Sequence, residues 1–368
     1  MIDLTLKKPQ PDVDRFCKVI RGETIPKTPP LAELIVDGAL IKDISTRLLG
    51  RQWPVNPKPD DFKAQGEFYK LWIEVWYRLG YDFVRWGGGL AFSGKSRATA
   101  DTSAEFNRGQ RHWTEEGTGP IASWDDFEKY PWPDLAKVDY RMVEHMSRIL
   151  PEGMGLFLCP SSGFLEIPLD TVLGYENMAL LLYDDPKLVK AVVDRCGELI
   201  LGWYRHTLGL PHVRGFFQGD DMGFKTQPLV GPDTLREMIL PWHKKLAKLA
   251  HDHNLLYLLH SCGQIDSIMD DLIDDVKIDA KHSFEDIIMP VAEFKKKYGS
   301  RIGVMGGIDV HKLCTLSEPE LRKEVRRTLD ACMPGGRYAL GSGNSVANYV
   351  PLNNYLAMLH EGLNYGRV

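Results

Sequence analysis

The sequence predicts a single (β/α)₈ barrel of the TIM type with a helical N-terminal extension, and three observations lead to this class. Strand-like apolar runs alternate with helix-like segments through most of residues 80–345. About seven or eight strands are expected, which fits one barrel better than a doubly wound sheet. No glycine fingerprint for a nucleotide follows the first strand. We therefore expect one domain over residues 1–368, with the extension at 1–80 and the barrel at 81–368.

The extension is predicted to consist of helices. A short helix over 11–22 ends before the Thr28-Pro29-Pro30 break, because proline cannot continue a helix. Apolar residues at helical spacing predict a second helix over 31–49, which ends at Gly50. A strongly amphipathic helix is expected over 62–80.

The barrel elements follow in alternation. Strands are expected at 81–86, 155–159, 213–218, 255–259, 277–281, 302–305 and 338–340. Helices are expected at 138–150, 170–182 with a break near Gly174, 186–208, 232–254 with a bend at Pro241, 265–273, 290–298, 318–333 and 352–363. Residues 90–133 are too long and too polar for a simple connection, and we expect them to cross over the site.

Composition narrows the function classes. A net charge of −5 and a pI near 6.1 give no electrostatic footprint for nucleic acid. No apolar run is long enough to span a membrane, and the N-terminus lacks the apolar core of a signal peptide. Six scattered cysteines in a chain of this length indicate a reducing compartment. We expect a cytoplasmic protein that binds neither nucleic acid nor membrane.

The run 255–263 is the most informative stretch, because its uncharged apolar residues end in His260-Ser261-Cys262-Gly263. Side chains two apart on a strand share a face, so His260 and Cys262 can aim at one point. An imidazole and a thiolate are good Zn²⁺ ligands. The alternative is that Cys262 is a small packed hydrophobe. Its place at the carboxyl end of a core strand, where barrels build their sites, favours the metal.

Other predicted strand ends carry polar or aromatic residues. They are Trp86, Ser161-Ser162, Asp220-Asp221, His282, Glu285, Asp309, His311, Ser342 and Asn344. Each has a structural alternative: Asp220 or Asp221 can cap a loop or helix, and Asp309 can begin the helix that follows it. Glu285 follows the next strand after His260 and is the predicted third zinc ligand, leaving a fourth position open for substrate, as in catalytic zinc sites.

These residues resemble the uroporphyrinogen decarboxylase-like superfamily. The resemblance runs nearly end to end and rests on Arg15-Phe16 through Glu23, Gly219-Asp220-Asp221, His260-Ser261-Cys262-Gly263, Tyr298 to Ile302, Gly306-Gly307-Ile308-Asp309 and Pro351-Leu352-Asn353-Asn354. It implies a (β/α)₈ barrel and one of two activities, a decarboxylase of heme biosynthesis or a cobamide-dependent methyltransferase.

Two departures separate these branches. True decarboxylases carry Arg-Gln-Ala-Gly-Arg-Tyr near the N-terminus, whereas this chain has only Arg51-Gln52-Trp53-Pro54. The His-x-Cys-Gly motif resembles the zinc site of methyltransferases that act with corrinoid proteins, and Ser283-Phe284-Glu285 resembles their Ser-x-Glu element. That branch typically completes its zinc site with a Cys seven residues before a Pro like Pro351, where this chain has Asn344.

The resemblance implies a zinc-dependent methyltransferase that moves a methyl group to the cobalt of a separate corrinoid protein. The donor is a small methylated molecule, with a methoxylated aromatic (an O-demethylase reaction) as one candidate. The cobamide is expected on the partner, because the chain has no recognisable cobalamin module; a homodimer is left open. Zn²⁺ would bind His260, Cys262 and Glu285, and Asp220 or Asp221 would act as general acid.

Substrate is expected to contact a set of aromatic and polar residues at the strand ends, namely Trp86, Met222, His282, Ser342, Asn344 and Tyr349. Two alternatives remain at this point. One is a metal-free decarboxylase of the uroporphyrinogen type, in which an aspartate stabilises a protonated pyrrole. The other is a catalytically silent family member that only binds a ligand or a protein.

Overall fold

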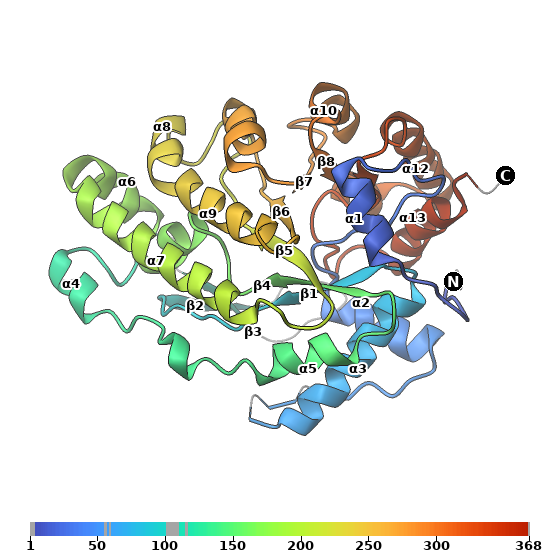
Figure 1. The fold of residues 1–368 in the computed structure, drawn as a ribbon, viewed down its shortest axis with the longest axis horizontal. Helices are drawn as coiled ribbons and strands as arrows, with labels where there is room; N and C mark the ends of the chain where they lie inside the picture. The colour runs from blue at the N-terminus through green and yellow to red at the C-terminus, as the bar shows by residue number, and fades with distance from the viewer. Residues whose placement is uncertain (1–3, 55–56, 59, 101–109, 115–116, 367–368) are drawn as a thin grey trace.

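A curled sheet of seven parallel strands forms the centre of the molecule (Figure 1), and the computed structural model describes residues 4–54, 57–58, 60–100, 110–114 and 117–366. Across the sheet the strands are β1 (Phe83–Gly87), β4 (Gly155–Cys159), β5 (Val213–Gly219), β6 (Leu256–His260), β7 (Ala280–His282), β8 (Gly303–Met305) and β9 (Tyr338–Ala339). Strands that are neighbours in the sheet follow one another in the chain, as barrel connectivity requires. The predicted barrel class and the seven strand positions are confirmed.

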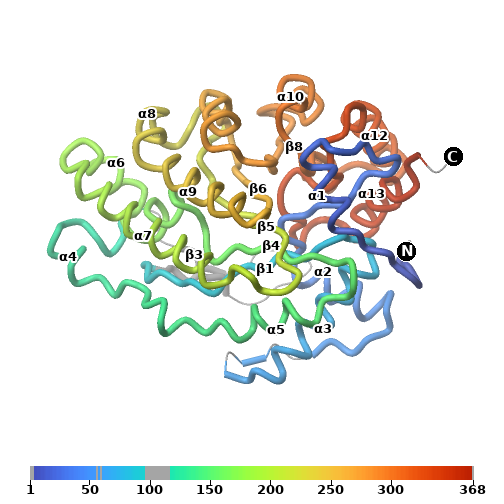
Figure 2. Tube along the Cα trace, in the orientation of Figure 1, coloured from blue at the N-terminus to red at the C-terminus, as the bar shows by residue number. Residues whose placement is uncertain are grey.

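Helices cover the outside of this sheet. Figure 2 shows the chain passing around it from green through yellow and orange to red. The helices after β1 are α4 (Trp124–Lys129), α5 (Arg141–Ile149), α6 (Tyr175–Asp184), α7 (Pro186–Thr207), α8 (Pro232–Thr234), α9 (Leu240–His251), α10 (Val291–Tyr298), α11 (Val310–Thr315), α12 (Glu318–Cys332) and α13 (Leu352–Asn364). Among the described residues, no helix is long and apolar enough to cross a bilayer.

Several helices are interrupted by wide π-type turns. The predicted break near Gly174 is confirmed, since a π-helical segment over 167–172 ends before this glycine at φ +83° and α6 begins after it. The bend at Pro241 corresponds to a π-helical segment over 235–239, because proline has no N–H to continue the regular ladder. The predicted helix over 265–273 is helical but irregular, because a 3₁₀ turn at 266–268 leads into a π-helical segment at 271–276.

Residues 30–36 are extended, so the predicted helix over 31–49 is wrong at its start. Leu31 and Val36 form parallel bridges with Leu340 and Val346, and the Ala32 N–H donates to the Leu340 carbonyl at 2.8 Å. The prolines before this segment favour extended backbone. Helix α2 (Gly38–Asp43) begins only after Asp37, whose side chain accepts from the Ala39 N–H. The segment 30–36 therefore lies beside β9, in the position of an eighth strand.

The interior of the barrel is a separate apolar cluster to which the extension contributes. Its members are Val13, Phe16, Cys17, Ile20, Ala32, Leu34, Phe83, Phe157, Phe217, Leu256, Leu258, Ala280, Met305 and Ala339. Helix α1 (Val13–Arg21) thus packs against the strand residues that face inward, while α3 (Phe62–Arg78) packs on β1 and α5. The extension predicted at 1–80 is an integral part of the barrel core.

The long connection after β1 contains an antiparallel hairpin, β2 (Ser96–Ala100) with β3 (Gln110–Thr114), followed by α4. Residues 101–109 and 115–116 lie outside the described residues, so the predicted crossing of this segment over the site stays a prediction.

Glu33 fastens the segment 30–36 to the loop after β9. Its carboxylate is fully buried and accepts from the Ser342 N–H at 2.8 Å and from the Ser342 hydroxyl at 2.5 Å. Burial raises the pKa of Glu33 from 4.5 to about 8, against the lowering effect of these two hydrogen bonds. At neutral pH the folded protein therefore holds a proton on Glu33 that the unfolded chain has lost.

This proton makes stability depend on pH. Between about pH 4.5 and pH 8 the folded state binds the extra proton, so the free energy of unfolding should fall as pH rises through this window and level off above it. We expect Glu33→Gln, which lacks the charge and keeps an acceptor for Ser342, to flatten the decline and to be more stable than wild type above pH 8 by a few kcal/mol, on the order of 3–5. Urea unfolding at a series of pH values measures this, with the exposed Glu293→Gln as control. Parallel pH curves for wild type and Glu33→Gln would contradict it.

Candidate functional site

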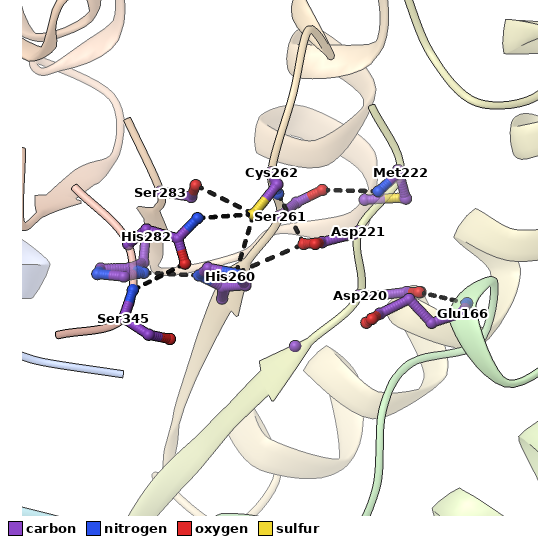
Figure 3. Close-up of polar contacts among 12 residues, drawn as sticks. Glu166, Asp220, Asp221, Met222, His260, Ser261, Cys262, His282, Ser283 and Ser345 are labelled. Carbon is purple, nitrogen blue, oxygen red and sulfur yellow. Dashed lines mark hydrogen bonds and ion pairs between the residues drawn. The ribbon is translucent and has the colours of Figure 1, made fainter. Parts of the chain in front are cut away.

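The carboxyl ends of β5, β6 and β7 bring a group of polar side chains together (Figure 3). The ladder continues past β5, because the Asp220 N–H donates to the His260 carbonyl at 2.9 Å. Asp221 follows, and its Oδ1 accepts from the Cys262 N–H at 2.8 Å. Asp220, Asp221, His260 and Cys262 therefore lie at one end of the barrel, as the sequence predicts.

Asp221, His260 and Cys262 form a group that fits a metal ion. One ligand atom from each lies within 4.8 Å of the others. The His260 Nε2 is 3.3 Å from the Cys262 Sγ and 3.4 Å from Asp221 Oδ1. Nitrogen, sulfur and oxygen donors in this number suit Zn²⁺ and leave one of its four positions open.

Glu285 is absent from this group among the described residues, and its role as third ligand stays a prediction. The prediction assumes that the chain continues straight beyond β7. Instead Ser283 adopts φ +88° and turns the chain immediately after the strand. Its hydroxyl, rather than the Glu285 carboxylate, contacts the Cys262 Sγ, at 3.4 Å. In this structure Asp221 lies beside His260 and Cys262.

Burial disfavours the charged forms of Cys262 and His260. Burial raises the pKa of the Cys262 thiol to about 12, with the charge of Asp221 acting in the same direction. Burial first, and then the neighbouring His282, lowers the pKa of His260 well below its usual value. A neutral imidazole is ready to ligate, whereas the thiol must lose its proton. A bound cation would supply the positive charge that a thiolate here requires.

Two donors already point at the sulfur of Cys262. The Asn344 Nδ2 lies 3.2 Å from Sγ, and the Ser283 hydroxyl lies on another side. Asn344 is held in place because its Oδ1 accepts from the Ser345 N–H at 2.7 Å. Both donors lower the pKa of the Cys262 thiol, so they favour the thiolate form.

His282 supports His260 from behind. Their Nδ1 atoms are 2.7 Å apart, and burial lowers the pKa of His282 to about 3. Two neutral rings share one proton across this contact. If His260 Nε2 offers its lone pair to a metal, its Nδ1 carries the proton and donates to His282. His282 is fully buried against His260, and its predicted contact with substrate stays a prediction.

Asp220 is committed to buried hydrogen bonds, and its role as general acid stays a prediction. Figure 3 shows Asp221 directed toward His260 and Cys262, while Asp220 is directed toward Glu166. The fully buried Asp220 carboxylate accepts from the N–H groups of residues 164–166 at 2.9–3.1 Å and contacts His243 Nε2 at 2.8 Å. His243 in turn contacts the Tyr257 hydroxyl at 2.6 Å. No acceptor atom of Asp220 faces the metal group.

Glu166 is a site residue that the sequence analysis missed. Its N–H donates to Asp220 Oδ1 at 3.0 Å. Burial, together with the charges of Asp220 and Asp221, raises the pKa of Glu166 to about 8. The apolar stretch around it gives no signal of a site, because only the fold carries residues 164–166 to the end of β5.

The other predicted substrate residues have different surroundings. Trp86 packs on Tyr69 with ring centroids 5.4 Å apart. Met222 is fully buried, and its N–H donates to the Ser261 hydroxyl at 3.1 Å. Ser342 is fully buried, and its hydroxyl donates to Glu33. It therefore positions the loop after β9 and does not face a cavity. Tyr349 is exposed.

Two cavities flank the site. One, of about 790 Å³, lies beyond β7, β8 and β9 and is lined in part by Glu285, His311, Asn344 and Tyr349. The other, of about 240 Å³, lies beside β1 and is lined in part by Arg85 and Trp86. Arg85 faces the barrel interior, and its charge helps to lower the pKa of both His260 and His282.

The family model described as uroporphyrinogen decarboxylase (URO-D) matches residues 120–363 of the chain, about two thirds of its length. This range includes every member of the metal group and its supporting residues. A solved structure, a methyltransferase from Methanosarcina mazei, superposes with a TM-score of 0.68 over 95% of this chain and 97% of that chain. At a sequence identity of 16%, this match shows that the two folds are alike and nothing more.

Two curated relatives are methyltransferases. A methylated-thiol–coenzyme M methyltransferase of Methanosarcina mazei is 26% identical over 50% of this chain and 47% of its own length. The methylcobamide:CoM methyltransferase MtaA of Methanosarcina barkeri is 29% identical over 36% of this chain and 36% of its own length. The chain thus spans about half or less of the length of these relatives.

Asp220 and Asp221 should differ sharply in their effect on stability. Asp220→Ala leaves three N–H groups and His243 without their buried acceptor, so we expect a loss of about 3–5 kcal/mol in the free energy of unfolding. Asp221→Ala removes a half-exposed side chain with one backbone contact and should cost about 1 kcal/mol. Urea unfolding of both variants measures the difference. Equal losses, or a larger loss for Asp221→Ala, would contradict the structural role of Asp220.

Proposed function

The chain belongs to the uroporphyrinogen decarboxylase (URO-D) family, and from this premise we propose that it is a zinc-dependent methyltransferase. It takes a methyl group from a small methylated donor and delivers it to the cobalt of a separate corrinoid protein. The curated relatives support methyl transfer, since both are methyltransferases and one is named for a methylcobamide. The decarboxylase alternative has no such support and lacks the arginine motif of that branch.

The observation that carries this proposal is the convergence of Asp221, His260 and Cys262 at the barrel end. These three residues would hold Zn²⁺, with Asp221 in place of the predicted Glu285. Bound there, Zn²⁺ would act as a Lewis acid that makes the donor heteroatom a better leaving group. The resemblance to the methyltransferase branch suggests a cysteine at position 344, but Asn344 donates to the Cys262 sulfur and so serves the site as a hydrogen-bond donor.

The residues of this chain prepare the site in three ways. His282 keeps the proton of His260 on Nδ1, so that Nε2 presents a lone pair. Ser283 and Asn344 donate to the Cys262 sulfur and stabilise its anionic form. Burial of His260 and His282 keeps water from competing for these positions.

Two finer features belong to the same proposal. The donor is a methoxylated aromatic, which is supported by the aromatic lining of the cavity beside β1. The protein works in a reducing, cytoplasmic setting, which is supported by six free cysteines.

Metal content tests the ligand set. We expect wild type, purified without a histidine tag and supplied with zinc, to retain stoichiometric zinc by mass spectrometry. Cys262→Ser and Asp221→Ala should lose it at least about 10–100-fold more readily to a chelator, because a ligand is missing. His282→Phe should weaken retention in the same range by removing the partner of His260.

Two matched variants serve as controls for this experiment. Cys314→Ser replaces a half-buried cysteine outside the metal group and should retain zinc. Glu285→Ala should also retain it. Loss of zinc in Glu285→Ala with retention in Asp221→Ala would restore the ligand expected from the sequence, and wild type without zinc would contradict the metal part of the proposal.

Methyl transfer itself is measured with cob(I)alamin as acceptor under anaerobic conditions. Zinc-loaded wild type is incubated with methanol, a methylated thiol or a methoxylated aromatic, and methylcobalamin is followed by its visible spectrum. We expect transfer from at least one donor, reduced roughly 100-fold or more in Cys262→Ser. Absence of transfer together with decarboxylation of uroporphyrinogen would overturn the proposal in favour of the alternative.

A further inference from the structure

The barrel has an open seam beside β1. Strand β1 pairs with β4 on one side, and the segment 30–36 pairs with β9. Within the described part of the chain, no backbone hydrogen bond joins the segment 30–36 to β1. The cavity of about 240 Å³ lies at this seam, with Leu34 and Ile35 on one side and Arg85, Trp86 and Gly87 on the other.

Half of the residues that line this cavity are aromatic. Helix α3 supplies Phe68, Tyr69, Trp72 and Trp76. Tyr69 and Trp72 are half-buried, so their rings are available to a ligand in the cavity. Such rings favour edge or offset contacts with another aromatic ring.

Arg85 is the positive charge in this lining, and no described residue forms an ion pair with it. It lies two residues after Phe83 on β1, on the same face of the strand, and therefore faces the barrel interior. Its Nε donates to the Phe217 carbonyl at 2.9 Å, and its guanidinium lies 5.6 Å from the Phe217 ring. Neither Nη atom has a hydrogen bond or ion pair with a described residue. These donors are open to the cavity and available to an acceptor there.

Two inward-facing strand positions between Arg85 and the metal group are glycines and therefore place no side chain in this space. Gly87 and Gly219 come two residues after Arg85 and Phe217 on their strands, so both face the interior. Gly219 pairs with His260, and a Cβ there would approach only His260 Cδ2, at 4.0 Å. A ligand held by Arg85 thus has room toward His260.

We propose that the methyl donor is a small aromatic carboxylate, with its carboxylate bound by the Nη atoms of Arg85 and its ring packed against Tyr69, Trp72 and Trp86. That this ligand donates a methyl group rests on the proposed function. That the cavity at the seam prefers an aromatic carboxylate rests only on the residues that line it. Arginine suits this task because its planar fork matches a carboxylate in a bidentate geometry.

Calorimetric titration tests the proposal without zinc, corrinoid or turnover. The probes are 3-methoxybenzoate and its neutral methyl ester. We expect wild type to prefer the acid over the ester by about 10–100-fold, as two charge-assisted hydrogen bonds provide. Arg85→Gln should remove this preference while leaving ester binding nearly unchanged. Equal affinity of wild type for acid and ester, or an unchanged preference in Arg85→Gln, would overturn the proposal.

Control experiments distinguish the effects of protein folding, of the charge at position 85 and of the aromatic ring of the ligand. Arg195→Gln changes an exposed arginine on α7 and should bind like wild type. Arg85→Lys keeps the charge and, if Arg85→Gln melts early, should still show a reduced preference, because a lysine cannot bind bidentately. Butyrate should bind more weakly than 3-methoxybenzoate, and equal binding would overturn the aromatic part. If binding of the acid depends on Arg85 but no methyl transfer occurs, the proposed function fails while the ligand class stands. If methyl transfer occurs from neutral donors alone, the proposed function stands and the carboxylate ligand class fails.

Discussion

The buried carboxylate of Asp220 is the constraint on which the arrangement of the site depends. It gathers three backbone N–H groups from residues 164–166 and a ring nitrogen from His243 of α9. A fully buried charge is tolerated only with such complete hydrogen bonding. Because Asp220 is held in this way, the chain after β5 must present the next residue, Asp221, to the end of β6, where His260 and Cys262 lie.

Burial disfavours the charged forms of the side chains in and around the metal group. Desolvation raises the pKa of Cys262 and Asp221 and lowers that of His260 and His282. Each of these shifts favours the neutral form of its side chain. A cation placed among them reverses this balance for the sulfur and carboxylate, which is how metal binding couples to proton release. Ser283 and Asn344 lessen the cost by donating to the sulfur.

The way the barrel closes has consequences for what it can bind. The eighth position is taken by the extended segment 30–36, which bonds to β9 and is secured by Glu33 on Ser342. Leaving the other side of this segment unpaired with β1 opens a cavity through the wall of the barrel, among the aromatic residues of α3. The same segment therefore completes the core and shapes a pocket next to Arg85.

Local patterns in the sequence determined most of the fold. The apolar runs that become β1 and β4 to β9, the helices between them, and the His-x-Cys motif at the end of β6 follow from side-chain periodicity, which acts within a few residues. The resemblance to the URO-D family and its methyltransferase relatives could also be recognised from short motifs. For these features the tertiary structure agrees with the prediction from sequence and supplies the distances between residues.

The tertiary structure decided what depends on contacts between distant segments. Residues 31–36 have helical spacing, yet they are extended because β9 offers an edge to pair with. The sequence predicts Glu285 as a ligand and Asp221 as a general acid, but the positive φ of Ser283 turns the chain before Glu285, while the hydrogen bonds of Asp220 direct Asp221 toward His260 and Cys262. Glu166 and the unpaired Arg85 carry no motif at all. Their significance comes from burial and from neighbours far along the chain, and neither is encoded in local spacing.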